Sequence, residues 1–466
     1  AEQVEELIDA IGDVTLDSYD SITAARAAYD KLSDNAKTLV GNYETLTAAE
    51  EALAKAEADV ISNAIKAIDA IGKVTADSKD KIENAKDAFS AVPERLRDKV
   101  TNSDTLDKAT ERFAVIDTIK QAGTKSKEHF STVLGTLADN NIYPVQSIGG
   151  EWSVIALARA GKLSADKAAK YYSELCEAVK ANGSDRLSDR KPTENARVII
   201  ALSSLGKNSA DIAGHNLLSG LDDMDYITSQ GINAVIFSLI AFDTTDYSAK
   251  THDELIAYIV DNMTGKGWAL AGNTADVDLT AMAIQALAPY AADEKVNAAI
   301  DSGLEFLAES LDENARYANG SESTSQVLIA LAALGIDPLT DSRFIVDGIT
   351  LIDALESYAT ENGYSHTLGG EENYMATEQA TLALTAYELS KDGSSLYEMS
   401  AKAEPTEPEK PDMPAQPGDS VKPGDCSGKP EDKNDPINPG TGVLVTGGMA
   451  VLISGAVMLI SKKKRK

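Results

Sequence analysis

The chain has 466 residues, enough for two or three domains, and its net charge is −31 because 74 Asp and Glu outnumber 43 Lys and Arg. This acidic balance excludes nucleic-acid binding through a basic surface and fits a self-repelling protein of a cell surface. Two cysteines, Cys176 in a predicted helix and Cys426 in a linker, can build neither a disulfide framework nor a Cys-based zinc site. We therefore expect no metal and no cofactor.

Residues 1–122 contain a repeat with an offset of 60 residues, in which Ile11 corresponds to Ile71 and Asn42 to Asn102. Apolar residues recur at spacings of three and four within each unit, which predicts helices with one buried face. We interpret this region as two small helical bundles in tandem that serve as a spacer, with an adhesive module as the alternative. The chain begins Ala-Glu-Gln, so we expect that a signal peptide was removed before its first residue.

Residues 123–400 repeat a different pattern six times. Each copy is an apolar stretch that contains a small residue followed by Leu, and three copies close at Gly161, Gly206 and Gly335. Gly in that position signals the end of a helix, and a helix without a polar face is buried on every side. The six pairs are Ala156-Leu157, Ala201-Leu202, Ser238-Leu239, Ala286-Leu287, Ala330-Leu331 and Ala383-Leu384.

An amphipathic, charged segment precedes each apolar copy and predicts a helix with one face in water. Twelve helices that alternate between half-exposed and fully buried suggest two concentric rings, and repeats of this period are typical of solenoids or closed rings. Six pairs is the number at which an (α/α)6 toroid closes. The expected amphipathic helices cover 125–139, 166–181, 210–222, 253–262, 294–311 and 344–359.

Four segments of this region carry a resemblance to a known superfamily. They are 149–161, 276–283, 320–331 and 375–380. Together they resemble the toroid superfamily of terpenoid cyclases and protein prenyltransferases, which also holds the cobalamin-carrier toroids. The resemblance covers 125–391 and implies an all-α fold with an (α/α)6 toroid. It is specific for the fold and says little about chemistry.

In relatives with this fold, the amino ends of the inner helices point into the central cavity. A helix amino end presents unpaired N–H groups and partial positive charge, so polar residues near the first turn are candidates for a ligand site. Each of them has a helix cap or a dipole partner as its alternative role. The candidates are Glu151, Trp152, Glu194, Asn195, Asn233, Asp276, Asp278, Glu322, Gln326, Glu378 and Gln379.

An enzymatic alternative follows from the same resemblance. Class II terpene cyclases protonate an alkene with the middle Asp of Asp-x-Asp-Asp, which implies Asp278 as proton donor beside Asp276. However, Leu279 replaces the third Asp, and aromatic residues, which stabilise carbocations in cyclases, make up only 5% of the chain. No Asp-x-Cys zinc motif of the prenyltransferases occurs, and His366 has no partner identifiable from the sequence.

A carbohydrate-active toroid is a second enzymatic alternative, in which Glu151, Asp278 and Glu378 would act as acid and base. The chain contains only two Trp, and such enzymes stack sugars on aromatic rings. We therefore favour a toroid that binds a small molecule, a glycan or a peptide without catalysis. A purely structural or adhesive role is the remaining alternative.

The last part of the chain changes composition abruptly at residue 401. Nine of the 14 prolines lie between Pro405 and Pro439, so 401–437 is expected to stay extended without a core. Residues 438–466 begin with a short polar motif, continue with 18 uncharged residues at 443–460, and end in a basic tail. The uncharged run is long enough to span a bilayer, with the basic tail inside. The motif is Asn438-Pro439-Gly440-Thr441-Gly442.

This three-part order resembles the sorting signal of Gram-positive cell-wall proteins, with Asn438 in place of the usual Leu. The resemblance implies that a sortase cleaves the bond between Thr441 and Gly442 and joins Thr441 to peptidoglycan. The alternative is a plain single-pass membrane anchor. Both interpretations place the protein at the extracellular face.

Overall fold

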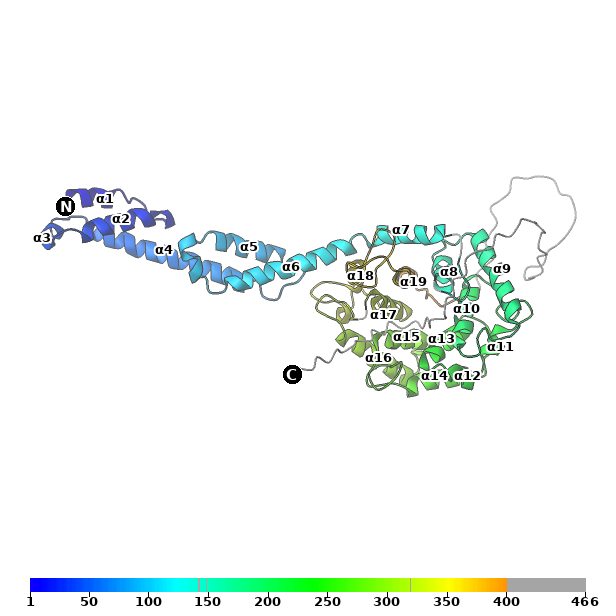
Figure 1. The fold of residues 1–466 in the computed structure, drawn as a ribbon. Coiled ribbons are helices and arrows are strands. Elements are labelled where there is room, and N and C mark those ends of the chain that lie inside the picture. The colour runs from blue at the N-terminus through cyan, green and yellow to red at the C-terminus, as the bar shows by residue number, and fades with distance from the viewer. Residues whose placement is uncertain (141–142, 148, 319, 400–466) are drawn as a thin grey trace, which may run out of the picture. The chain divides into compact units, whose positions relative to one another are not determined.

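The computed structural model forms two compact units, Ala1–Lys120 and Gln121–Lys466. The regular secondary structure of the described residues is helical, with isolated β-bridges and no strand (Figure 1). The expectation of an all-α chain is therefore confirmed. The described residues are 1–140, 143–147, 149–318 and 320–399.

The first unit contains two helical bundles with separate cores, and the long helix α4 contributes its first half to one core and its second half to the other. Residues 60 apart make the same contacts: Asn42 Nδ2 donates to Asp9 Oδ1 at 2.8 Å, and Asn102 Nδ2 donates to Asp69 Oδ1 at 2.8 Å. The elements are α1 (Glu2–Asp9), α2 (Tyr19–Asp30), α3 (Asp34–Lys37), α4 (Tyr43–Asp69), α5 (Lys79–Ser90) and α6 (Ser103–Gly123), with short 3-10 helices at Leu16–Ser18 and Glu94–Lys99.

Six apolar helices of the second unit are buried along most of their length and contact one another in a cyclic order. They are α8 (Glu151–Arg159), α10 (Pro192–Ser204), α13 (Ile232–Asp243), α15 (Val277–Leu287), α17 (Ser321–Ala333) and α19 (Tyr374–Ser390). Each packs against the next, and α19 packs back against α8. We call these six the inner helices.

The remaining helices of this unit lie outside the inner helices, as Figure 1 shows. α14 packs on α13, α16 on α15 and α18 on α17, while α7 contacts both α8 and α19. These outer helices are α7 (Ser126–Asp139), α9 (Ala165–Asn182), α11 (Leu217–Leu221), α12 (Met224–Thr228), α14 (His252–Asp261), α16 (Glu294–Glu309) and α18 (Leu351–Glu356), with 3-10 helices at Ala288–Tyr290 and Ser342–Phe344.

The repeated small-Leu pair lies in the last turns of the inner helices. Leu157 O accepts the backbone N–H of Lys162 at 2.8 Å, and Leu331 O accepts that of Ile336 at 2.9 Å. The Schellman motif contains two such bonds, and this is the one that spans more residues. It requires a left-handed backbone conformation at the residue just before the donor. Glycine adopts that conformation without strain. The glycines are Gly161, Gly206 and Gly335, with φ of 65°, 64° and 67°.

Two of the expected amphipathic helices, 210–222 and 344–359, are wrong over most of their length. In each case a tight turn in the left-handed region interrupts the helix, at Ala213-Gly214 and at Asp347-Gly348. The turns are closed by reciprocal backbone bonds between their flanking residues. Helix begins only after the capping residues Asn216 and Thr350. Asp347-Gly348 is a turn signal that the apolar spacing had outweighed, whereas at Ala213-Gly214 only the glycine signals a turn.

Candidate functional site

The candidate residues lie at the amino ends of the inner helices, where side chains of the helix tie down the segment that precedes it. Asn195 Oδ1 accepts from the backbone N–H of Leu187 at 2.8 Å, and Thr280 and Thr377 do the same for Trp268 and Tyr364. Asn195 also donates to two backbone carbonyls and is fully buried. Its hydrogen-bonding capacity is used within the fold, so Asn195 positions a loop.

Asp276 is a helix cap. Its Oδ1 accepts from the backbone N–H of Leu279 at 3.0 Å, which satisfies one of the unpaired donors of α15. Asn373 performs the same task for α19, because its Oδ1 accepts from Ala376 N at 3.0 Å. Asp276 therefore has the geometry of a helix cap, which was the alternative to a role in ligand binding.

Glu151 and Glu194 belong to one ion-pair network around Arg197. Arg197 Nε donates to Glu151 Oε2 at 2.9 Å, and its Nη2 donates to Glu194 Oε2 at 2.8 Å. Glu151 also accepts from Tyr171 Oη at 3.2 Å and is completely buried. Burial raises the pKa of Glu194, and the charge of Arg197 opposes that rise. The single positive charge of Arg197 is thus shared between the two carboxylates.

Glu378 is bound by neutral donors. Its Oε1 accepts from Ser153 Oγ at 2.7 Å and from Ser153 N at 3.2 Å. Burial raises the pKa of Glu378, and the hydrogen bonds from Ser153 lower it in part. Trp152, the neighbour of Ser153, packs its ring 5.5 Å from that of Phe237, and its Nε1 has no partner among the described residues.

Asp278 and Glu322 occupy the second position of neighbouring inner helices, α15 and α17, and both are 4% exposed. Ser323 Oγ donates to Asp278 Oδ1 at 2.5 Å. Glu322 Oε2 accepts from Ser321 Oγ at 3.2 Å and lies 2.8 Å from His366 Nδ1. Of these two buried carboxylates, Asp278 thus contacts α17 through Ser323, and Glu322 contacts the segment before α19 through His366.

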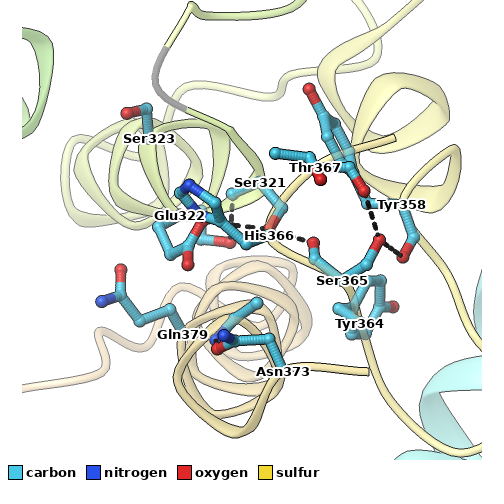
Figure 2. Close-up of polar contacts among 12 residues, drawn as sticks. Ser321, Glu322, Ser323, Tyr358, Tyr364, Ser365, His366, Thr367, Asn373 and Gln379 are labelled. Atoms are coloured by element: carbon cyan, nitrogen blue, oxygen red, sulfur yellow. Dashed lines mark hydrogen bonds and ion pairs between the residues drawn. The ribbon is translucent and has the colours of Figure 1, made fainter. Parts of the chain in front are cut away.

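His366 is a member of this group that the sequence analysis could not place. It belongs to the segment before α19 and reaches Glu322 across 44 residues of sequence. Its side chain is 44% exposed, whereas that of Glu322 is 5% exposed. Figure 2 shows Glu322 beside Ser321 and His366. No local signal marks the pair, because its two members lie one repeat apart.

Three buried glutamines, one each on α15, α17 and α19, are hydrogen-bonded to one another. Gln285 Nε2 donates to Gln326 O at 3.0 Å and to Gln326 Oε1 at 2.9 Å, and Gln326 Nε2 donates to Gln379 Oε1 at 3.1 Å. Gln285 Oε1 has no partner among the described residues. Gln285 was missed from the sequence, although a glutamine inside an apolar helix is itself a signal of a buried polar contact.

The structure therefore divides the candidates into separate groups. Asp278, Glu322, Gln326 and Gln379 lie on α15, α17 and α19 in three separate hydrogen-bonded sets, together with Gln285 and His366; we call these residues the α15–α17–α19 cluster. Glu151 and Glu194 pair with Arg197, Glu378 lies at the contact of α8 and α19, and Trp152 packs against Phe237 of α13. Asp276 and Asn195 bind backbone groups. Asn233, the second residue of α13, is 5% exposed, and its Oδ1 has no partner among the described residues.

Within the part of the chain that the structure describes, no group of three or more His, Cys, Asp or Glu residues is placed to hold a metal ion. No helix of those residues is both long and apolar enough for a bilayer span. The expected linker, the motif at Asn438–Gly442 and the uncharged run at 443–460 lie outside the described residues. Comparison with protein-family models, with curated proteins and with solved structures finds no match for this chain.

Proposed function

We propose that the second unit is an (α/α)6 toroid of the terpenoid-cyclase and prenyltransferase type. The proposal rests on the cyclic order of the six inner helices and on the second set of helices outside them. It also rests on the four segments of sequence that resemble that superfamily. In such a ring the amino ends of α15, α17 and α19 lie at one end, where the polar cluster gathers.

The toroid binds a polar ligand at this end and does not transform it. One observation carries this proposal: the α15–α17–α19 cluster holds two carboxylates and three amides, all buried, and a half-exposed imidazole, beyond the side chains that cap the helices. Capping is done by other residues, Asp276 and Asn373. Buried polar groups are costly unless they are paired or used, and convergent polar groups are typical of ligand sites.

Binding is favoured over catalysis by two features. Leu279 stands where a cyclase has the third motif Asp, and Asp278 accepts a hydrogen bond from Ser323. His366 is hydrogen-bonded to Glu322, and among the described residues no Ser or Cys side chain donates to its ring as an activated nucleophile would. The enzymatic alternative, with Asp278 as proton donor, predicts product from polyprenoid or glycan substrates.

The binding proposal is tested by thermal-shift screening of the full chain against neutral sugars, amines, short peptides and polyprenoids. We expect at least one polar compound to raise the melting temperature, and its effect to fall when Gln379→Leu removes an amide of the cluster. Glu361→Gln, an exposed change outside the cluster, is the control and should leave the shift intact. A panel without any hit, or a hit unaffected by Gln379→Leu, contradicts the proposal. Product formed from any compound contradicts the absence of catalysis.

The same proposal places the toroid on the outside of a Gram-positive cell. The order of motif, uncharged run and basic tail at 438–466 supports covalent attachment by a sortase through Thr441 to peptidoglycan. The helical bundles of the first unit, which precede the toroid in the chain, then serve as a spacer. A single-pass anchor and a purely adhesive role remain the competing proposals.

A further inference from the structure

The joint between the two helical bundles of the first unit is not held by a shared hydrophobic core. The buried apolar residues of the bundles form two separate clusters, and α4 runs through both bundles (Figure 1). Residues 54–59 of α4, between the two cores, belong to neither of them. Because helices in proteins are stabilised mainly by tertiary packing, this part of α4 is where the helix bends most easily.

An open groove lies at this joint. Its volume is about 640 Å³, and residues of both bundles line it, among them Leu16 of the first bundle, Val92 and Pro93 of the second, and Ala56 of α4. A protein interior, in contrast, is packed without gaps of this size. Close packing between the bundles therefore does not fix the angle between them on this side of α4.

Arg95 reaches across the joint. It belongs to the 3-10 helix Glu94–Lys99 of the second bundle, and its guanidinium carbon lies 3.8 Å from the centre of the Tyr19 ring, at the start of α2 in the first bundle. Its Nη1 donates to Glu57 Oε1 at 2.5 Å, and its Nη2 lies 3.5 Å from Leu16 O. Glu57 is part of the stretch of α4 that belongs to neither core. A planar guanidinium can stack on a ring and donate hydrogen bonds in its own plane, so one side chain makes all three contacts.

These contacts are specific to the joint and are not a part of each repeat. At an offset of 60 residues, other residue types stand at all three positions, and both bundles nevertheless form a core. The positions that correspond to Arg95, Tyr19 and Glu57 are Asn35, Lys79 and Asp117. The bundle fold therefore does not require the three residues, and their role is to be sought at the joint.

We propose that Arg95 is a clamp that fixes the angle between the two bundles, so that the first unit resists bending at the middle of α4. The side chains of Arg95 and Glu57 are 27% and 19% exposed, so water screens their ion pair less than a pair on the open surface. This inference rests on the spacer role in the proposed function and makes the spacer stiff. It involves no residue of the α15–α17–α19 cluster, so its failure would leave the proposed binding function standing.

The test is the distribution of distances between two spin labels on the full chain, measured by double electron–electron resonance. The labels are attached through Ala27→Cys and Asp87→Cys, at exposed and corresponding positions of α2 and α5. Cys426→Ser removes a competing thiol, and Cys176 is buried. We expect one narrow distribution for this chain, and Arg95→Ala should at least double its width.

Arg97→Ala is the matched control, because Arg97 belongs to the same 3-10 helix but contacts its own bundle. Its Nε donates to Val92 O at 3.3 Å, and its guanidinium lies over the Phe89 ring. Arg97→Ala should leave the width unchanged, whereas Tyr19→Leu, which removes the stacked ring from the other side of the joint, should broaden the distribution. A broad distribution with Arg95 in place would overturn the inference, and so would equal widths for Arg95→Ala and Arg97→Ala. The Tyr19→Leu chain decides the question even where Arg95→Ala impairs folding, since a width unchanged in that chain would also overturn the inference.

Discussion

At the scale of single residues, two buried glutamates of the second unit differ in the groups that surround them. Glu151 forms an ion pair with Arg197. Glu378, in contrast, accepts hydrogen bonds from the neutral donor Ser153. An ion pair favours the charged carboxylate, and burial disfavours it. The pKa of Glu378 is accordingly raised, chiefly by burial.

This raised pKa predicts a definite pH dependence. Between the ordinary glutamate pKa of about 4.3 and the raised pKa of Glu378, the folded state holds a proton that the unfolded state has lost, so the free energy of unfolding falls as pH rises. Glu378→Gln removes this contribution, while its amide oxygen can still accept from Ser153. The variant should therefore gain stability relative to wild type as pH increases through this interval.

Urea unfolding followed by Trp fluorescence measures this difference in the relevant unit, since both tryptophans, Trp152 and Trp268, belong to it. Asp246→Asn, at an exposed position, serves as the control and should run parallel to wild type. Parallel curves for Glu378→Gln and wild type between pH 4 and 7 would show that folding leaves the pKa of Glu378 unshifted, and would contradict the prediction.

At the scale of elements, the inner helices were predictable because their signals are local. The small-Leu pair followed by Gly marks the Schellman ends at Leu157 and Leu331, and apolar residues on all faces mark their burial. The interrupted segments around Ala213 and Asp347 were not predicted, because apolar spacing there outweighed a two-residue turn signal. The contact of His366 with Glu322 joins different repeats, so no sequence pattern near either residue predicts it.

The difference between a capping carboxylate and a ligand-binding one can be measured on α15. Asp276 caps the helix, so Asp276→Ala should lower the free energy of unfolding by roughly 0.5–2 kcal/mol. It should leave the affinity for any ligand from the screen unchanged, since Asp276 lies outside the α15–α17–α19 cluster. Asp246→Ala is the control and should change neither quantity. A loss of affinity without a loss of stability would show that Asp276 binds the ligand and does not act as a cap.

At the scale of the whole molecule, the proposal assigns separate tasks to separate parts of the chain. The two helical bundles of the first unit have their own cores, as do the inner helices of the second. Covalent anchoring at Thr441 would fix the chain to the wall while the toroid remains outside. The acidic charge of −31 is consistent with a displayed, self-repelling surface protein.

Anchoring predicts how the protein is released from cells. Digestion of the wall with a muramidase should release it, and detergent alone should not, because a covalent bond to peptidoglycan survives detergent. Thr441→Ala should shift the protein to the membrane fraction or the medium, whereas Thr406→Ala, in the expected linker, should leave it in the wall. Complete extraction of the wild-type protein by detergent would favour the single-pass anchor.

The central claim is that the amino ends of α15, α17 and α19 form the binding site. It is tested most directly by a crystal structure of the full chain grown with the tightest compound from the screen. The account predicts that this compound lies within hydrogen-bond distance of Glu322 and Gln379, with a donor directed to the carboxylate. A compound bound to the outer helices or to the helical bundles, with no contact to the α15–α17–α19 cluster, would contradict the account.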